Sequence, residues 1–328
     1  MEIEKMNKSG LLDKCKELGI TKCSSKKKSE LVQIINDKVN TYSTTLDVSE
    51  NSALTQIQLQ LQAKTPIKHL KPLVKWSGGK SDEIKQFEKY IPTDYDAYIE
   101  PFVGGGSLYF YLSPEKAVIS DVHSELVDLY KCVGNKKSNE IYDFMKNHPN
   151  DEETYYQVRD NMIVNDYVDN AKRFYYQRKT CFRGMLRYNK NGKFNIPFGR
   201  YKTINYDDLK NKDYEELLSK TEILNQSFEY IFENYNNENN FMFLDPPYDS
   251  EFTDYGYCQF GKEDQKKLAK LFKETKIKCL MIIGKTAFIE ELYKDYIVNE
   301  YKKMYKFKLY AGRIGDEINT THLIIKNY

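Results

Sequence analysis

The sequence predicts an α/β fold in which helices cover an open, mostly parallel sheet. From about residue 67 onward, short apolar runs typical of buried strands alternate with helix-like segments, as in sheets whose parallel strands are joined by helices. A glycine-rich turn follows one of these strands, and an acidic residue, Asp245, ends another. Open α/β sheets bind their ligands at the carboxyl ends of the strands. Both features are therefore expected beside a bound molecule.

Residues 1–40, ahead of this domain, are predicted to form two short helices. The first apolar face holds Leu11, Leu12, Cys15 and Leu18, with Gly19 suited to cap the end, and the second holds Leu31, Val32, Ile34 and Ile35. Between them, Lys22–Ser29 is a basic loop that can hold a phosphate at a helix N-terminus. The pattern resembles a SAP-type DNA-binding helix pair, although the glycine often found in its loop is absent. A plain helical hairpin is the alternative.

Residues 41–66 are rich in Thr, Ser, Asn and Gln, which is typical of a flexible linker. Residues 67–328 then form the main domain. Within it the alternation stops between about residues 141 and 218, which predicts a mostly helical insert. The expected buried strands of the sheet are Ala97–Ile99, Ala117–Ile119, Phe241–Leu244, Cys279–Ile283 and Leu323–Ile325.

The composition of the 328-residue chain disfavours several classes of protein. Its mean hydropathy is −0.70, and no apolar run approaches the ~20 residues of a membrane span. The N-terminus has no apolar signal region. Six scattered cysteines without a C-x-x-C pair, and four scattered histidines, give no support to disulfides or a metal site. We therefore expect an intracellular protein, in the cytoplasm or nucleus, that binds neither a membrane nor a metal.

The stretch from Arg173 to Lys202 holds nine basic residues and no acidic one, with aromatic residues interleaved. Lysine and arginine neutralise phosphates, and aromatic rings stack on bases or wedge between them. A solvated basic face is the usual alternative for such a run. The absence of acids over this length favours nucleic acid as the partner.

The glycine-rich turn, Glu100–Ser107, joins the strand ending at Ile99 to a helix-like segment. Its three successive glycines, Gly104–Gly106, allow positive φ and a close approach of a ligand to the backbone. Asp121, at the end of the next strand, can accept hydrogen bonds from ribose hydroxyls, so the pair fits a nucleoside cofactor. A nicotinamide dehydrogenase is the competing class, but the glycines lack the G-x-G-x-x-G spacing.

Asp245-Pro246-Pro247-Tyr248 follows the apolar strand Phe241–Leu244. Two prolines fix φ and remove two N–H groups, so the carbonyl oxygens there are free to accept hydrogen bonds. This rigid acceptor cluster beside an aromatic face suits a planar ring with an exocyclic NH2 group, such as a nucleobase. A tight turn after a strand is the plain alternative. Far upstream, Leu73–Lys80 contains the one tryptophan of the chain, Trp76.

Together these motifs resemble the Dam-type (D12 class, alpha-group) DNA N6-adenine methyltransferases, in the order of the alpha group. Lys75–Lys80 and Glu100–Ser107 look like cofactor motifs, Asp245–Tyr248 like the catalytic D-P-P-Y, and Cys181–Gly199 like the target-recognition hairpin. The resemblance implies a Rossmann-like S-adenosylmethionine-dependent methyltransferase sheet, a mostly helical target-recognition insert and a small N-terminal helical module. It further implies methyl transfer from S-adenosyl-L-methionine to adenine N6 in double-stranded DNA, at a GATC-like site, by a monomer.

The resemblance also assigns roles to individual residues. Catalysis falls to Asp245, Pro246, Pro247 and Tyr248. Cofactor contacts fall to Trp76, Lys80, Glu100, Phe102, Gly104, Gly106, Ser107, Asp121, Phe228 and Asp245. DNA contacts fall to Lys179, Phe182, Arg183, Arg187, Asn189 and Pro197, with Arg187 the candidate for reading guanine.

Three positions depart from the family pattern. Ser227 replaces an acid before Phe228, Arg183 replaces an asparagine of the hairpin, and Gly284-Lys285 replaces a Ser-Asn type sequence. The main alternative is therefore a catalytically inactive DNA-binding protein with a methyltransferase fold. Methylation of cytosine N4 or of an RNA base is another, because the same acceptors serve any exocyclic amine, but the motif order disfavours it. The SAP-like pair suggests a eukaryotic or viral setting, including a viral protein acting in a host cell.

Overall fold

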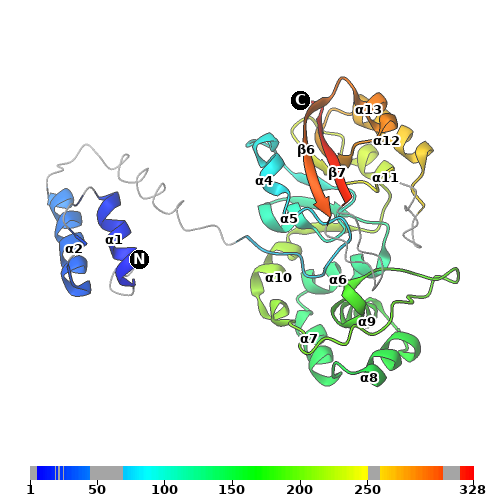
Figure 1. The fold of residues 1–328 in the computed structure, drawn as a ribbon, viewed down its shortest axis with the longest axis horizontal. Coiled ribbons are helices and arrows are strands. Elements are labelled where there is room, and N and C mark those ends of the chain that lie inside the picture. The colour runs from blue at the N-terminus through cyan, green and yellow to red at the C-terminus, as the bar shows by residue number, and fades with distance from the viewer. Residues whose placement is uncertain are drawn as a thin grey trace. The chain divides into compact units, whose positions relative to one another are not determined.

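The computed structural model describes residues 6–18, 20, 23–24, 26–44, 69–249, 259–305 and 318–328. The chain divides into two compact units, Met1–Lys68 and His69–Tyr328, each of which is considered by itself (Figure 1). In the described ranges, none of the helices has the length and apolar character needed to cross a bilayer. Within the same ranges, no three His, Cys, Asp or Glu side chains gather so that they could hold a metal ion.

The first unit contains two helices, α1 (Lys8–Glu17) and α2 (Lys28–Thr44). α1 begins after Asn7, whose side chain accepts a 2.9 Å hydrogen bond from the N–H of Gly10. The two helices share a small apolar core made of Leu11, Cys15, Cys23, Leu31 and Ile35. A helix pair therefore lies where the sequence predicts one.

α2 extends to Thr44, past the position at which the sequence predicts the start of the linker. The predicted helix cap Gly19 lies outside the described residues, and so do Lys22 and Ser25 of the basic loop. The same holds for positions 45–66 of the predicted linker.

Seven strands form the sheet of the second unit, in the order β3-β2-β1-β4-β5-β7-β6. Their bounds are β1 Tyr98–Glu100, β2 Ala117–Ser120, β3 Thr221–Leu224, β4 Phe241–Leu244, β5 Lys278–Gly284, β6 Ile297–Tyr305 and β7 Ile318–Lys326. The five strands β3, β2, β1, β4 and β5 run parallel to one another, whereas β7 is antiparallel to both β5 and β6. The chain order reverses between the neighbours β1 and β4, the point at which open α/β sheets bind ligands.

The predicted α/β fold class is confirmed, and all five predicted strands are present. Sequence reasoning missed β3 and β6, the two outer strands. β3 is only partly buried and begins with the polar residues Thr221 and Glu222. β6 carries Asn299, Glu300 and two lysines among its nine residues. Edge strands with charged residues lack the apolar run that identifies a buried strand.

Helices cover both faces of the sheet, and each face has its own apolar core. Successive residues of a strand point to opposite faces. Thus Phe241 and Phe243 of β4 pack in one core, and Met242 and Leu244 in the other. Helices α4 (Ile84–Phe87), α5 (Ser107–Leu112), α6 (Ser124–Gly134), α9 (Tyr167–Thr180) and α10 (Lys212–Ser219) contribute to the first core. Helices α11 (Phe228–Asn234), α12 (Lys262–Glu274) and α13 (Ala287–Tyr293) contribute to the second.

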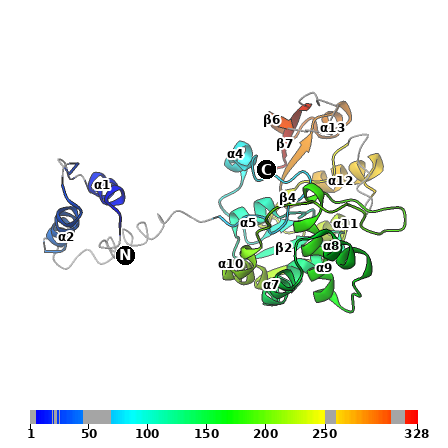
Figure 2. The ribbon, with the colours of Figure 1, turned by 60° about the horizontal axis from the view of Figure 1, so that its bottom comes forward.

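The insert between β2 and β3 is mostly helical. Besides α9 and α10 it contains α7 (Ser138–Asn147), α8 (Glu152–Tyr156), a π-helical turn (Gln157–Asn161) and a 3-10 turn (Asp207–Lys210). Figure 2 shows α7, α8 and α9 grouped together. After α9 the chain forms a hairpin over residues 181–199, closed by antiparallel bridges from Cys181 to Phe198 and from Tyr188 to Phe194. A further 3-10 turn, Phe182–Gly184, lies at its base.

Candidate active site

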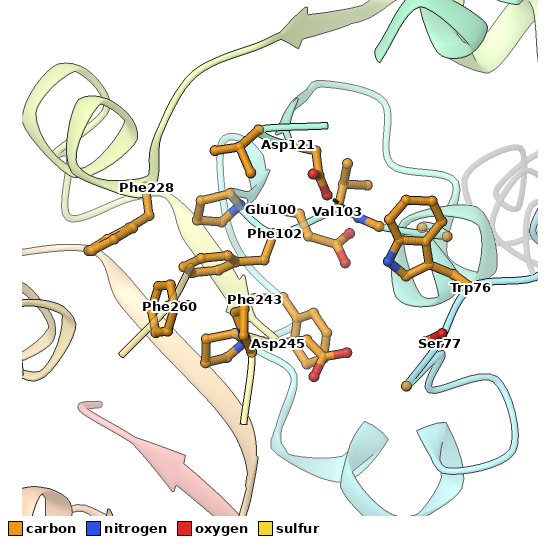
Figure 3. A pocket seen from close by; sticks show the side chains of 18 of the residues that line it. Trp76, Ser77, Glu100, Phe102, Val103, Asp121, Phe228, Phe243, Asp245 and Phe260 are labelled. Atoms are coloured by element: carbon orange, nitrogen blue, oxygen red, sulfur yellow. Dashed lines mark hydrogen bonds between the residues drawn. The ribbon is translucent and has the colours of Figure 1, made fainter. Parts of the chain in front are cut away.

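The two strands at the reversal point converge on a cavity. β1 and β4 pair in parallel, so their carboxyl ends deliver Glu100 and Asp245 to the same edge of the sheet. A cavity of about 530 Å³ lies at this edge. Figure 3 shows Trp76 on one side of it and Phe228 and Phe260 on the other.

Every residue that the sequence assigns to the cofactor or to catalysis lines this cavity. These residues are Trp76, Lys80, Glu100, Phe102, Gly104, Gly106, Ser107, Asp121, Phe228, Asp245, Pro246, Pro247 and Tyr248. Sequence reasoning missed Val122, Glu229 and Phe260, which also line it. Phe260 belongs to no motif, and its ring meets that of Phe102 edge-on at 5.7 Å between centroids. Such a contribution follows from the fold and has no signal in the sequence.

The glycine turn packs directly against Trp76. Gly104 has φ +45° and Gly106 has φ +67°, the left-handed region that favours glycine. A Cβ on Gly104 would lie 2.6 Å from the indole ring of Trp76, which no real side chain could tolerate. The hydroxyl of Tyr130 donates a 2.7 Å hydrogen bond to the Gly104 carbonyl oxygen and thereby holds the turn in place. The glycines thus allow backbone, indole and ligand to share one narrow space.

Asp121 holds the same turn from the end of β2. Its carboxylate accepts the N–H of Gly104 and the N–H of His123, each at 2.9 Å. Burial raises the pKa of Asp121 to about 6, although these backbone N–H groups oppose the shift. The carboxylate therefore has a structural task that the sequence does not reveal, in addition to the predicted contact with a ribose.

Glu100 and Phe102 shape the middle of the cavity. Glu100 is buried and accepts a 2.7 Å hydrogen bond from the hydroxyl of Tyr98. Burial raises the pKa of Glu100 well above its ordinary value, as do the nearby charges of Asp245 and Asp121. The ring of Phe102 stacks on that of Phe228, with centroids 5.5 Å apart. An aromatic wall with a polar group beside it suits a planar heterocycle.

Two of the departures from the family pattern have counterparts at the cavity. Ser227, which stands where the family has an acid, directly precedes α11. Two residues later, Glu229 places an acid on the cavity wall, and its carboxylate pairs with Lys267 at 2.7 Å. Gly284 ends β5 beneath the catalytic motif, where an added Cβ would lie 3.0 Å from Cδ2 of Tyr248. Glycine at this position leaves room for the tyrosine ring.

Lys80 lies behind the catalytic motif. Its Nζ is 2.7 Å from the carboxylate of Asp245 and 2.6 Å from the carbonyl oxygen of Gly78. The same ammonium lies 5.1 Å from the centroid of the Tyr248 ring. Burial raises the pKa of Asp245, and the charge of Lys80 opposes that shift. The lysine therefore favours the ionised carboxylate, the form that accepts hydrogen bonds with both oxygens.

Glu83 lies behind Lys80, and its carboxylate binds side chains of β6 and β7. Its carboxylate is 2.7 Å from Nδ1 of His322, 2.8 Å from the hydroxyl of Tyr301 and 3.0 Å from Nζ of Lys303. Burial alone would raise the pKa of Glu83, but His322, Lys80 and the other partners outweigh it and lower the pKa to about 2. The carboxylate is therefore ionised at neutral pH.

Glu83 should make the stability of the fold depend on pH. Its folded pKa of about 2 lies below its ordinary value of about 4.5, so its contribution is present above pH 4.5 and is lost as the pH falls through 2. We expect the difference in unfolding free energy between the wild type and Glu83→Gln to shrink over this range. Urea denaturation at a series of pH values measures it. A difference that stays constant would contradict the assignment.

The predicted target-recognition residues lie on the hairpin and at its base. Arg187 is exposed, and its Nε donates a 2.8 Å hydrogen bond across the hairpin to Oδ1 of Asn195. Pro197 is exposed, and its carbonyl oxygen accepts the N–H of the half-buried Phe182 at 2.8 Å. Arg183 is exposed and has φ +56°. The hairpin thus presents Arg187, Pro197 and Arg183 on a fixed backbone.

Asn189, another predicted DNA contact, closes the tip of the hairpin. Its Oδ1 accepts the N–H of Asn191 at 2.9 Å and the N–H of Lys193 at 3.0 Å. Its backbone carbonyl oxygen accepts the N–H of Gly192, which has φ +70°. Asn189 therefore sets the geometry of the tip, a role that turn chemistry explains.

A basic groove adjoins the cavity. Its volume is about 680 Å³, and it shares Trp76 and Ser107 with the cavity wall. The cationic residues that line it are Lys71, Lys75, Arg178, Lys179 and Arg183. Sequence reasoning included the last three and missed Lys71 and Lys75, which lie about a hundred residues upstream of the basic run. A cationic groove of this kind suits the phosphate backbone of a nucleic acid.

Two members of the basic run also hold parts of the chain together. Arg178 is buried and donates to the carbonyl oxygens of Met185, at 2.6 Å, and of Lys75. Arg173 donates to the carboxylate of Glu125 at 3.0 Å. These internal contacts of the basic run could not be predicted, because charge in the sequence does not reveal which arginines bind other parts of the chain.

The fold and the cavity together define a methyltransferase built on a Rossmann-like sheet. Residues 76–307 match the D12 class N6 adenine-specific DNA methyltransferase family, and the chain belongs to this family. The family implies a DNA substrate and a methyl donor. The match begins at residue 76, so it does not concern the N-terminal helix pair.

Relatives include enzymes from a virus, an archaeon and a bacterium. The type II methyltransferase M.CviBI of Paramecium bursaria Chlorella virus NC1A is 63% identical over 261 residues, which cover 79% of this chain and 100% of the relative. The type II methyltransferase M.MjaIII of Methanocaldococcus jannaschii is 36% identical over 62% of this chain and 80% of its own. The DNA adenine methylase of Haemophilus influenzae is 29% identical over 70% and 85%.

Proposed function

We propose that this protein transfers a methyl group from S-adenosyl-L-methionine to N6 of adenine in double-stranded DNA, at a specific site. The observation that carries the proposal is that the acceptor Asp245, the aromatic Tyr248 and the glycine turn line one cavity. A methyl donor held by the turn and an amino group held by Asp245 would meet there. Such positioning supplies much of the rate of a transfer reaction.

The cavity fits S-adenosyl-L-methionine in size and chemistry. A volume of about 530 Å³ lies in the range of small-molecule sites. Asp121 would accept hydrogen bonds from the ribose hydroxyls, and the adenine ring would lie against the aromatic wall formed by Phe102 and Phe228. Close approach to the backbone is possible at Gly104 and Gly106. When bound, this cofactor supplies an electrophilic methyl group on a sulfonium.

The residues of the catalytic motif would act on the amino group of the target adenine. The amino lone pair is delocalised into the ring, which makes it a poor nucleophile. Asp245 and the carbonyl oxygen of Pro246 would accept the two NH2 hydrogens, return the lone pair to nitrogen and stabilise the positive charge that develops there. Tyr248 would stack on the base, which must leave the duplex to reach the cavity.

Incubation of the purified protein with unmethylated plasmid and S-adenosyl-L-methionine tests the proposal. Single-molecule sequencing then maps the modified bases, and Asp245→Ala serves as the control. We expect N6-methyladenine at one short motif, absent from the control. Methylation of cytosine would redirect the proposal to another amine. No modification, despite tight binding of duplex DNA, would favour the inactive DNA-binding protein.

Arg187 is proposed to read a guanine in the major groove, by analogy at a GATC-like site. Arg187→Ala should lower kcat/KM on the mapped site by about 10- to 100-fold, since a bidentate contact to guanine contributes about 1–3 kcal/mol of discrimination. The loss should concentrate at one base pair when all single substitutions of the site are compared. Lys190 is an exposed charge on the hairpin tip, and Lys190→Ala should lower kcat/KM by the same factor on all of these DNA sequences. The same uniform loss for Arg187→Ala would count against base reading.

The N-terminal helix pair is proposed as a SAP-like module that adds phosphate contacts. Its helices carry lysines, among them Lys14 and Lys16 in α1 and Lys28 at the start of α2. Joined to the enzyme by a linker, it would raise the effective concentration of the protein on DNA. Deletion of residues 1–40 should weaken binding and processivity on long DNA and leave turnover on short duplexes unchanged. A large fall in turnover at saturating DNA would exclude this role.

The wider setting follows from the relatives. Two of these relatives are type II methyltransferases, so a role in restriction and modification is proposed. A monomeric state is proposed from the resemblance to the Dam-type enzymes alone. A viral relative supports a protein that acts inside a host cell, in cytoplasm or nucleus. Gel filtration and a search for a partner endonuclease activity in the source cells test these points.

A further inference from the structure

A buried polar cluster lies behind the catalytic motif, between the turn that carries Lys80 and the strands β6 and β7. At its centre is Glu83, which is 3% exposed and has His322, Tyr301 and Lys303 as partners. An ionised carboxylate can only accept hydrogen bonds, so Nδ1 of His322 carries the proton. His322 itself is fully buried. None of the sequence motifs contains Glu83 or any of these three partners.

This cluster reaches both parts of the catalytic motif. The N–H of Glu83 donates a 2.7 Å hydrogen bond to the carbonyl oxygen of Lys80, whose ammonium is 2.7 Å from Asp245. On the other side, the ring of His322 meets the ring of Tyr248 at an interplanar angle of 88°, with centroids 5.2 Å apart. Glu83 therefore contacts the Lys80 turn through its backbone N–H, and its carboxylate acts on the Lys80 charge and binds His322, which meets the aromatic platform.

The charges of the cluster matter for the proposed reaction. The amino nitrogen of adenine becomes positive as it accepts the methyl group, and a cation behind the acceptor opposes that change. Glu83 offsets the charge of Lys80 across a buried region, where charges are screened less than in water. The charge of Glu83 also raises the pKa of Asp245, which makes its carboxylate a stronger hydrogen-bond acceptor as long as Lys80 keeps it ionised.

We propose that Glu83 and His322 are positioning residues for methyl transfer. The carboxylate of Glu83 offsets the charge of Lys80 behind Asp245 and anchors His322, and His322 holds the ring of Tyr248 in place. Neither residue lines the cavity, so both act through the two residues that they support. This inference rests on the proposed function and adds to it two residues that lie outside the D-P-P-Y motif.

Single-turnover kinetics of the full-length protein on its mapped site test the charge of Glu83. Glu83→Gln should lower the rate about tenfold or more, which corresponds to about 1.4 kcal/mol of barrier. The Kd values for S-adenosyl-L-methionine and for the duplex should stay within about threefold, since the carboxylate touches neither. Glu83→Asp, which keeps the charge, should recover most of the rate. Glu88→Gln, the same change at an exposed position of the same segment, should leave every value unchanged.

His322→Asn tests the second support. Asparagine keeps an N–H donor for Glu83 and removes the ring that meets Tyr248. With 2-aminopurine at the target position, we expect brighter fluorescence in the complex than with the wild type, because a flipped base that stacks poorly on Tyr248 is quenched less. The single-turnover rate should fall in parallel.

The outcomes separate positioning from a purely structural role. A rate for Glu83→Gln within about twofold of the wild type, corrected for the folded fraction, overturns the proposal. Equal losses in rate and in both affinities also overturn it, because they indicate general disruption. If Glu83→Gln does not fold, His322→Asn decides, and unchanged fluorescence and rate reject the proposal. Wild-type turnover in the same assay is the separate test of the proposed function.

Discussion

Asp245→Ala is expected to lower the single-turnover rate of methyl transfer about a thousandfold, because loss of one preorganised partner of a developing charge costs about 10²–10³. Asp245 supplies the charged acceptor, held by the buried Lys80 at 2.7 Å. The affinities for cofactor and duplex should change much less, since the acceptor acts mainly on the reacting amino group. Rapid-quench kinetics and calorimetric titration measure the two effects separately.

Two further variants make this result specific. Asp245→Asn keeps one carbonyl-type acceptor and loses the charge, so its rate should lie between those of the wild type and Asp245→Ala. Asp295→Asn makes the same change at an exposed position between α13 and β6 and should have no effect. If Asp245→Ala kept a tenth or more of the wild-type rate, Asp245 could not be the main acceptor.

The central sheet could be predicted because its strands are buried on both faces. Phe241–Leu244 is a continuous apolar run, and the strand has these bounds. The same physical reason explains what was missed. β6 is an edge strand, so polar residues such as the exposed Asn299 and Lys302 are tolerated there. A pattern that depends on two-sided burial carries no signal for such a strand.

The cavity could be predicted from motifs because its chemistry is local in the sequence. The glycine turn and the catalytic motif are each continuous, and the sheet order joins them through the pairing of β1 with β4. Glu83 and His322 could not be predicted, because they are 239 positions apart and meet only in the folded chain. Nothing in the local sequence of either residue distinguishes it from an ordinary surface residue.

Lys80→Met is the other change with a large expected effect, a fall of about a hundredfold in the single-turnover rate at neutral pH. The methionine fills a similar volume and removes the cation that pairs with Asp245. Breaking a buried ion pair leaves one charge without compensation and costs about 3–5 kcal/mol, unless the remaining group takes up a proton. Asp245 can do so, because burial already raises its pKa.

The protonation of Asp245 gives this prediction its pH dependence. Lys80 favours the ionised carboxylate, so its removal raises the pKa of Asp245 further. The protonated acid accepts fewer hydrogen bonds from the amino group, so the acidic limb of the pH–rate profile should move to higher pH, with part of the lost rate recovered in alkaline buffer. The raised folded pKa should also make the variant most stable, relative to the wild type, at acidic pH, and this advantage should disappear as the pH rises through the folded pKa.

Lys85→Met is the matched control for this variant. Lys85 lies on α4, five residues after Lys80, and its side chain is exposed, so the same loss of charge should leave both the rate and its pH profile unchanged. A Lys80→Met profile with the wild-type acidic limb and a uniformly lower rate would mean that Lys80 positions Asp245 without tuning its protonation. The position of that limb therefore decides whether the buried cation acts on the catalytic carboxylate through its charge or through its shape.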